Sequence, residues 1–513
     1  MTKIATVWLK LCWIVLCFSG AFGELLAHES ANSPEKRPRN VVFILADDLG
    51  WADVSCYGQL QFATPNIDRL ASRGMRFTQH YSGAPVCAPS RCVLMTGKHL
   101  GHAEIRGNKQ AKTVDPRFDE GQIPLSENST TLAMLLQKQG YRTGAFGKWG
   151  LGPVGSTGSP EKKGFDEFFG YNCQAVAHSY YPATLWKNTS RVPLNSQPIP
   201  GHKKQPSGDV RCDDWVGENY APYRMMDEAI RFLEESSNKP FFLYLPLIEP
   251  HVALHPPVKR LDDFPKEWDT EVYRGENGYL PTARPRAAYA ALVTDIDSYV
   301  GRILDTLDQL KLTDNTLVIF TSDNGATHPS TANNKFHVGG ADVNFFQSTG
   351  YLRGHKGSVH EGGIRVPMIA SLPGVIQPNT ICETPTYFAD WLPTILEATQ
   401  TTTSYDQSDG ESFWKLLTEE KKNWKREKPM IWVFPEYGGQ VAIRSEQWKL
   451  VRKQLNTPKR PGPWELYDLS MDESEQSDVA WKHPELVQIL SERLLLEMND
   501  NERFPVKIPN ETE

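Results

Sequence analysis

The chain has 513 residues, a net charge of −7 at pH 7 and 39% hydrophobic residues. This length exceeds what a single hydrophobic core normally supports, so we expect one large domain and a smaller one. The acidic balance leaves no broad basic face, which excludes a general nucleic-acid or membrane-surface binder. Any anion site must therefore be built locally.

The N-terminal residues are typical of a secretory signal peptide. Residues 1–23 combine an early lysine, an apolar stretch and small residues near their end. The apolar stretch is too short for a membrane span, so we expect no stable membrane anchor. Residues 24–39 are polar and contain prolines, which predicts a disordered leader. The protein is thus expected to be secreted or periplasmic, or lysosomal or extracellular in a eukaryote.

Apolar strands alternate with helical patterns along the chain, which favours an α/β fold with a large, mainly parallel sheet flanked by helices. The first strand, 41–46, is uniformly apolar and ends at Asp47 and Asp48. Such a pattern is typical of a strand buried on both faces. A helix is expected at 64–74, because a capping threonine and a proline stand at its start.

The segment Cys87-Ala-Pro-Ser-Arg91 places a thiol directly before an apolar helical run. Free backbone N–H groups and the helix dipole favour anionic ligands at such a position. Arg91 adds a permanent positive charge there. A cysteine before a helix is more often a small buried hydrophobic residue than a nucleophile. The complete Cys-x-Pro-Ser-Arg pattern is much rarer by chance than a lone cysteine, so we interpret Cys87 as functional.

Three further strands end in polar residues. Helices are expected at 131–139 and 287–310, and strands at 141–146, 241–245 and 316–320. These strands run into Lys148, into His251, and into Asp323 with Asn324. Any one such residue is about as readily a strand cap as a functional group. Because ligands bind at the C-terminal strand edge of an open α/β sheet, the four strand ends together with Cys87 favour a site.

The residues at two of these strand ends favour a hard cation. Asp47, Asp48, Asp323 and Asn324 offer only oxygen ligands, whereas zinc sites prefer histidine nitrogen and cysteine sulfur. Calcium tolerates an irregular, carboxylate-rich geometry better than magnesium does. We therefore predict a Ca²⁺ site, with Mg²⁺ as the less favoured ion.

The C-terminal part of the chain has its own pattern. Residues 441–451 and 464–468 are typical of strands in an antiparallel hairpin, and 484–498 of a closing helix. Six cysteines follow the signal segment: Cys56, Cys87, Cys92, Cys173, Cys212 and Cys382. This number does not make a disulfide framework. A bond between Cys173 and Cys212 is left open.

From Asn40 to about Leu495 the chain resembles the type I, formylglycine-dependent sulfatases, of the arylsulfatase A kind, within the alkaline phosphatase superfamily. The resemblance rests on the signature from Cys87 to Arg91, on the strand-end residues, and on the motif from Leu352 to Arg365 around Lys356. It implies an alkaline phosphatase-type catalytic domain over 40–380. A small domain with an antiparallel sheet and a helix would occupy 381–513.

The resemblance also implies site residues and partners. Metal ligands would be Asp47, Asp48, Asp323, Asn324 and Cys87, the last as formylglycine. Active-site groups would be Arg91, Lys148, His251 and Lys356. A formylglycine-generating enzyme would modify the chain, and a sulfated small molecule or glycan would be its substrate.

The chain departs from the family at Gly150, where many members have a histidine directly after the Lys-Trp pair. That histidine usually acts as a base on the hydrated aldehyde. His178, in the following segment, is our candidate replacement. The alternative that His178 is a surface residue or contacts the substrate is equally open.

The implied reaction is hydrolysis of a sulfate ester. The cation, Lys148 and Lys356 would balance the developing charge, while His251 would protonate or hydrogen-bond the leaving alcohol. Aromatic residues within 171–186 would stack on a sugar ring, which favours a sulfated carbohydrate, although aromatic residues more often fill cores. Two alternatives stay open: a phosphate or phosphonate monoester hydrolase of the same superfamily, and a non-catalytic, secreted glycan-binding protein in which Cys87 remains a thiol.

Overall fold

The computed structural model describes residues 40–329, 337–402, 405–418, 424–456 and 461–508. The predicted signal peptide and leader therefore lie outside the described residues. Within these ranges, none of the helices combines the length and hydrophobicity needed to cross a bilayer.

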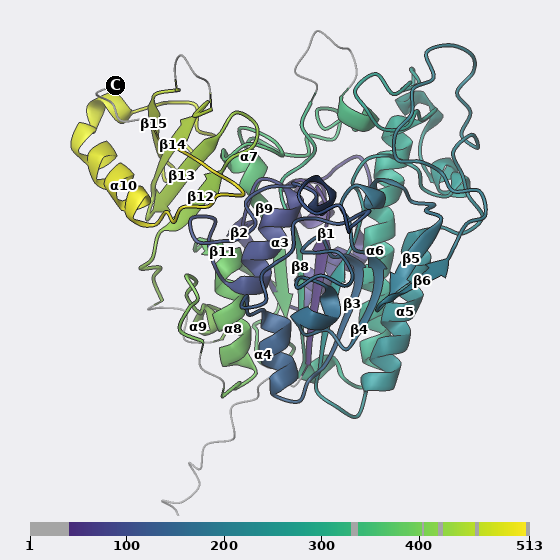
Figure 1. The fold of residues 1–513 in the computed structure, drawn as a ribbon, viewed down its shortest axis with the longest axis horizontal. Coiled ribbons are helices and arrows are strands. Elements are labelled where there is room, and N and C mark those ends of the chain that lie inside the picture. Colours follow the sequence, from purple (N-terminus) through teal and green to yellow (C-terminus); the bar gives the residue numbers. More distant parts are fainter. Residues whose placement is uncertain (1–39, 330–336, 403–404, 419–423, 457–460, 509–513) are drawn as a thin grey trace, which may run out of the picture. The chain divides into compact units, whose positions relative to one another are not determined.

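An 11-stranded sheet forms the centre of the fold (Figure 1), in the order β10-β2-β9-β8-β1-β7-β3-β4-β5-β6, with β11 paired to β2. Its strands are β1 (Asn40–Ala46), β2 (Met75–Tyr81), β3 (Arg142–Lys148), β4 (Glu167–Tyr171), β5 (Thr184–Lys187), β6 (Ser190–Pro193), β7 (Phe241–Pro246), β8 (Thr316–Ser322), β9 (Arg365–Ser371), β10 (Thr380–Cys382) and β11 (Thr386–Tyr387). The run from β8 to β4 is parallel. β9 lies antiparallel between β2 and β8, and β5 and β6 form an antiparallel edge. The predicted large, mainly parallel sheet is confirmed.

Helices pack on both faces of this sheet. They are α2 (Pro65–Ser72), α3 (Cys87–Thr96), α4 (Leu132–Lys138), α5 (Ala221–Ser236), α6 (Pro285–Gln309), α7 (Glu361–Ile364), α8 (Trp391–Ala398) and α9 (Trp414–Leu417). Val41, Phe43 and Leu45 of β1 join a core that contains residues of α3, α4 and α8, whereas the even-numbered residues of β1 join a core with α2, α5 and α6. This burial on two sides explains why the sequence of β1 is uniformly apolar.

The predicted elements lie within a few residues of their observed bounds. The N-cap Thr131 accepts a hydrogen bond from the backbone N–H of Met134 at the start of α4, at 3.2 Å. α6 begins two residues earlier than expected. β3, β7 and β8 extend further than the apolar runs, toward the residues that we singled out at their ends.

A second, four-stranded antiparallel sheet lies near the C-terminus. It contains β12 (Met430–Phe434), β13 (Gln440–Ser445), β14 (Trp448–Lys453) and β15 (Trp464–Asp468), and α10 (Pro484–Leu496) packs on β13 and β14 (Figure 1). The predicted antiparallel strands and closing helix are confirmed, except that 441–451, expected as one strand, forms the hairpin of β13 and β14. The boundary at residue 380 stays a prediction; β10, which spans it, and β11, which follows it, pair with β2 of the large sheet.

A buried ionic network joins the two sheets. Lys449 of β14 lies 2.8 Å from a carboxylate oxygen of Glu361, in α7, and 3.0 Å from one of Glu475, and all three side chains are fully buried. The hydroxyl of Tyr81, in β2, donates to the other oxygen of Glu361 at 2.5 Å. The network thus fixes the start of α7, which directly follows the loop that carries Lys356.

We expect Lys449→Met to lower the free energy of unfolding by about 3–5 kcal/mol, because it removes the buried ammonium that two buried carboxylates share. Chemical denaturation of the full chain measures this change. Lys239→Met, at an exposed lysine, is the matched control, and it should change stability by no more than about 0.5 kcal/mol. Equal effects of the two substitutions would show that the network contributes nothing.

Candidate active site

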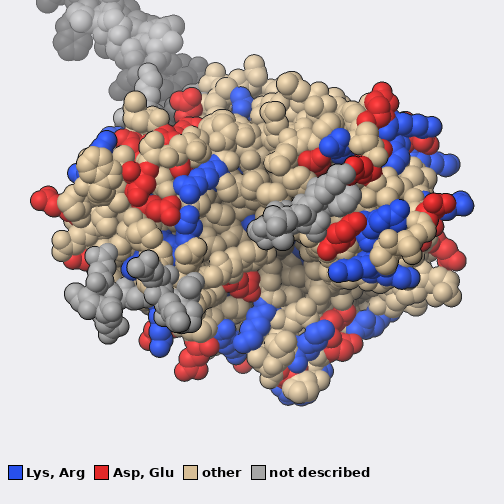
Figure 2. Space-filling view, turned by 90° about the horizontal axis from the view of Figure 1, so that it is seen from above, with Lys and Arg blue, Asp and Glu red and all other residues tan. Residues whose placement is uncertain are grey.

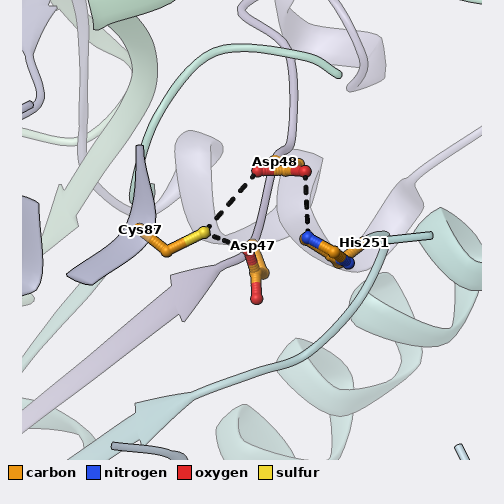
Figure 3. A group of neighbouring side chains, drawn as sticks. All are labelled: Asp47, Asp48, Cys87 and His251. Carbon is orange, nitrogen blue, oxygen red and sulfur yellow. Dashed lines mark hydrogen bonds and ion pairs between the residues drawn. The ribbon is translucent and has the colours of Figure 1, made fainter. Parts of the chain in front are cut away.

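The four strand ends predicted to carry polar groups belong to neighbouring parallel strands. These strands lie side by side in the order β8-β1-β7-β3, and their C-terminal ends meet at one edge of the sheet. The residues at these ends are, in the same order, Asp323 and Asn324, Asp47 and Asp48, His251, and Lys148. The N-terminus of α3 brings Cys87 to the same place, and Figure 3 shows Cys87 and His251 on either side of Asp47 and Asp48. None of these side chains, nor Arg91, is more than 3% exposed.

This edge of the sheet faces the viewer in Figure 2, which looks onto the molecule from above. The surface is hollowed near its centre, and both Lys or Arg and Asp or Glu side chains lie around the hollow, so the charge on this face is mixed.

Cys87 is the first residue of α3 and points at the two aspartates. Its Sγ donates to Oδ1 of Asp47 at 3.3 Å and lies 4.0 Å from Oδ1 of Asp48 (Figure 3). Burial, together with the charge of Asp47, raises the pKa of the Cys87 thiol well above its ordinary value. Because the thiolate is the nucleophilic form, an unmodified Cys87 is a poor nucleophile here.

Asp47 and Asp323 share the guanidinium of Arg91. Its Nε and Nη2 donate to Oδ2 of Asp323 at 3.0 and 2.8 Å, and Nη2 lies 3.5 Å from Asp47. The ammonium of Lys148 also pairs with Asp47. Burial alone would raise the pKa of Asp47, but the charges of Lys148, His251 and Arg91 hold it below its ordinary value. Burial and the charge of Asp47 raise the pKa of Asp323 to about 6.

Asp48 is the most crowded carboxylate of the site. Its oxygens accept from Asn324 Nδ2 at 2.7 Å, from the Thr327 hydroxyl at 3.0 Å and from Lys356 Nζ at 2.7 Å. His251 Nε2 lies 3.6 Å away. Burial opposes ionisation of Asp48, yet the charges of Lys356 and His251 outweigh it and lower the pKa. The same pairing raises the pKa of Lys356 against the effect of its own burial.

These residues fit a hard divalent cation. Three buried carboxylates converge with Asn324, whose Oδ1 has no hydrogen-bond partner among the described residues although it is buried. An unpaired buried oxygen is costly, and a cation would satisfy it. The three carboxylates face three cationic side chains, so a divalent ion would leave the site with net positive charge.

Two stacked histidines border the carboxylates. The rings of His251 and His178 lie parallel, with centroids 4.8 Å apart and an angle of 6°. Burial and the charge of Lys356 lower the pKa of His251 to about 4, and burial with the charge of His251 lowers the pKa of His178. Both rings are therefore neutral at pH 7 in the arrangement described. The structure thus brings His178 next to one of the predicted active-site groups.

Gly150 leaves room for a residue that the sequence analysis missed. Its φ is +79°, and a Cβ atom there would lie 1.8 Å from Nε2 of Gln174. The amide of Gln174 thus occupies the space that a side chain at 150 would need. Both amide atoms are buried without a hydrogen-bond partner in the described part of the chain. The glycine at position 150, where many family members have a histidine, was the one sequence signal that another side chain fills this space.

One expectation needs correction, and one open question is answered. Of the aromatic residues within 171–186, Tyr171, Tyr180 and Tyr181 are each 2% exposed and fill the core instead of offering rings to a sugar. Tyr171 and Tyr180 can be buried because their hydroxyls donate to the carbonyls of Ser179 and His251. The disulfide left open between Cys173 and Cys212 is not formed, and all six cysteines of the described residues are free.

Comparisons with known proteins decide the family. The family model described as Sulfatase matches residues 39–401, and the model for the C-terminal part of N-sulphoglucosamine sulphohydrolase matches residues 354–501. The chain belongs to the sulfatase family. It is a sulfuric ester hydrolase, which decides against the non-catalytic glycan-binding alternative.

This sulfatase is 30% identical to human arylsulfatase A, over 93% of the chain and 91% of the relative. It is 27% identical to an N-acetylgalactosamine-6-O-sulfatase of Bacteroides thetaiotaomicron, over 90% and 94% of the two chains. It covers 63% of the mouse steryl-sulfatase. The crystal structure of Ps i-CgsB in complex with k-i-k-neocarrahexaose is similar with a TM-score of 0.70 and 27% identity, over 90% of this chain and 92% of that one.

Proposed function

We propose that this sulfatase removes O-sulfate groups from sulfated carbohydrates, using a formylglycine made from Cys87 and one bound Ca²⁺. The observation that carries the proposal is the convergence of Cys87 with three buried carboxylates and three cationic side chains. The hydrated aldehyde would supply an oxygen nucleophile that the protonated thiol lacks. A formylglycine-generating enzyme would be required to make it.

Asp47, Asp48, Asp323 and Asn324 would hold the cation, with residue 87 beside it. When bound, the cation would supply positive charge to balance the sulfuryl oxygens and lower the pKa of a coordinated oxygen. Oxygen ligands favour Ca²⁺ over Zn²⁺, and the irregular carboxylate cage favours Ca²⁺ over Mg²⁺.

Lys148 and Lys356 would bind the sulfate group. Each ammonium now pairs with one aspartate. Once a cation neutralises those carboxylates, the ammonium groups can face an anionic ester, where they stabilise developing charge. Arg91 holds Asp323 with two hydrogen bonds and also donates to the carbonyl of Lys148, so it positions both.

His251 would hydrogen-bond the departing alcohol. Its Nδ1 faces the carbonyl of Val252 and must donate to it, so the neutral ring presents a bare Nε2 to the site. That nitrogen can accept a hydrogen bond but has no proton to give. Lys356, which stays protonated, would supply the proton that the leaving oxygen needs.

Two relatives support a carbohydrate as the alcohol half of the substrate. One is named for N-acetylgalactosamine sulfate hydrolysis, and the other was crystallised with a neocarrahexaose. The signal peptide predicted at 1–23 would send the enzyme out of the cytoplasm, where such glycans are met.

A substrate comparison tests the proposal. We expect the formylglycine-containing enzyme to hydrolyse 4-nitrophenyl sulfate with a higher kcat/KM than 4-nitrophenyl phosphate, and to release sulfate from O-sulfated saccharides. Sulfate release is measured by ion chromatography. A preference for the phosphate ester would favour the phosphate or phosphonate monoester hydrolase instead.

A further inference from the structure

A directed chain of hydrogen bonds leads from a loop backbone to His178. The backbone N–H of Tyr279 donates to Nδ1 of His202 at 3.2 Å. Nε2 of His202 and Nδ1 of His178 lie 2.9 Å apart. The three rings also pack together, with centroids 4.6 Å apart between His202 and Tyr279 and 5.1 Å apart between His178 and Tyr279.

The first link determines the direction of the others. A backbone N–H can only donate, so Nδ1 of His202 must keep its lone pair. The proton of neutral His202 therefore lies on Nε2, which donates to Nδ1 of His178. With its Nδ1 accepting, neutral His178 carries its own proton on Nε2. His178 is thus held as the Nε2–H tautomer.

The surroundings of His178 keep the ring in place. It ends the short helix η4 (Val176–His178) and stacks on His251. Gly201 lies so close that an added Cβ would be 2.7 Å from Cβ of His178. Tyr279 has a left-handed backbone with a φ of 67°, uncommon for a bulky residue, which directs its N–H at His202.

The two stacked histidines have opposite tautomers. His251 donates from Nδ1 to the carbonyl of Val252, so its Nε2 carries a lone pair. His178 carries a proton at the corresponding atom, and that atom has no hydrogen-bond partner among the described residues. The pair therefore offers one acceptor, at the Nε2 that lies 3.6 Å from Asp48, and one donor on the ring stacked against it.

We propose that His178 contacts the substrate as a hydrogen-bond donor, and that His202 is a positioning residue that fixes its tautomer. This inference rests on the proposed function. Nε2–H of His178 donates to an oxygen of the bound sulfate ester. The substrate would therefore be a sulfate ester that places an acceptor oxygen next to the stacked His178 and His251 rings. The role differs from that of a general base, which needs a free lone pair at Nε2.

Substitution by glutamine separates the two roles. The amide nitrogen of a glutamine side chain takes the place of Nε2 and donates, but it has no basicity. We expect His178→Ala to lower kcat/KM by about 10- to 100-fold, the effect of one hydrogen bond to a charged group. His178→Gln should recover most of that loss. A glutamine variant as impaired as the alanine variant, with equal formylglycine content, would overturn the donor role.

His202 supplies a matched pair of variants. His202→Gln keeps a donor toward Nδ1 of His178 and should stay within about threefold of the unmodified chain, because the relay survives. His202→Leu removes the donor, so part of His178 should adopt the other tautomer and KM should rise more than kcat falls. Equal kinetics for the two variants would contradict the positioning role.

The tautomer itself can be read without turnover. Neutron diffraction from crystals of the full chain in deuterated solvent should place deuterium on Nε2 of His178, with Nδ1 bare. In His202→Leu, deuterium should appear at Nδ1 as well. Deuterium on Nδ1 of the unsubstituted chain would overturn the inference. An enzyme without sulfatase activity but with deuterium on Nε2 would instead refute the proposed function alone.

Discussion

Cys87→Ala is expected to abolish sulfate ester hydrolysis. The substitution removes the side chain at the start of α3 whose Sγ lies next to both Asp47 and Asp48. Without it no aldehyde can form and no nucleophile stands between the carboxylates, so kcat should fall to the background of the assay. The measurement is sulfate release at saturating substrate, together with mass spectrometry of the peptide that contains residue 87.

Cys92→Ala is the matched control. Cys92 lies five residues further along α3, is fully buried and belongs to the hydrophobic core. It should cost some stability and keep activity, because it does not face the site. Mass spectrometry should find the aldehyde at residue 87 in the control and the unsubstituted chain. Undiminished turnover by Cys87→Ala, or a thiol at residue 87 in fully active enzyme, would refute the proposed mechanism.

The central strands of the fold could be predicted from the sequence because each is buried on two sides. For that reason β1, β7 and β8 contain the apolar runs 41–46, 241–245 and 317–320. The strands β4, β5 and β9 to β12 were missed even though β9 and β12 are buried. Also missed were β2, with the sequence Met-Arg-Phe-Thr-Gln-His-Tyr, and the exposed edge strand β6. Their polar residues face solvent or side chains from distant parts of the chain, so no simple periodicity marks them.

The strand-end groups of the site were predictable for a related reason. Parallel strands that lie side by side must bring their C-terminal residues to one edge, so Asp47 and Asp323 meet although 276 residues separate them. The loops between strands carry no comparable rule. Thr327, Gln174 and His202 reach their positions through loop conformations that the sequence does not reveal.

The buried tyrosines illustrate the opposite error. Tyr180 and Tyr181 lie in the segment 171–186, whose aromatic residues we expected to stack on a sugar ring. In the structure the hydroxyl of Tyr180 donates to the carbonyl of His251 at 2.8 Å, so this tyrosine helps to hold the backbone of an active-site residue in place. A tyrosine can be buried when its hydroxyl finds a partner, and the sequence does not reveal that partner.

Loss of one carboxylate from the proposed cation cage is the second large effect that we expect. Asp323→Asn keeps the shape of the side chain but removes one negative charge from a group that faces Asp47, Arg91 and Asp48. Metal analysis should find one Ca²⁺ per unsubstituted chain and much less in the variant. Turnover should fall by about 100-fold or more, because the cation would supply several kcal/mol of charge stabilisation.

Chelation and add-back test the same cage without substitution. EGTA should inactivate the unsubstituted enzyme, and Ca²⁺ should restore it more fully than Mg²⁺. Calcium at 100 times its Kd should also stabilise the fold by about 2.7 kcal/mol, which thermal unfolding detects.

The control is Asp297→Asn, at a buried aspartate that accepts from the backbone of Asn66 and Ile67 far from the site in sequence. It should keep its calcium and its turnover, because only the charge at the cage matters. Metal analysis that finds one zinc ion per chain would contradict the proposed calcium site. Full activity in Asp323→Asn would also contradict it, because activity that survives the loss of a carboxylate ligand does not depend on a hard cation.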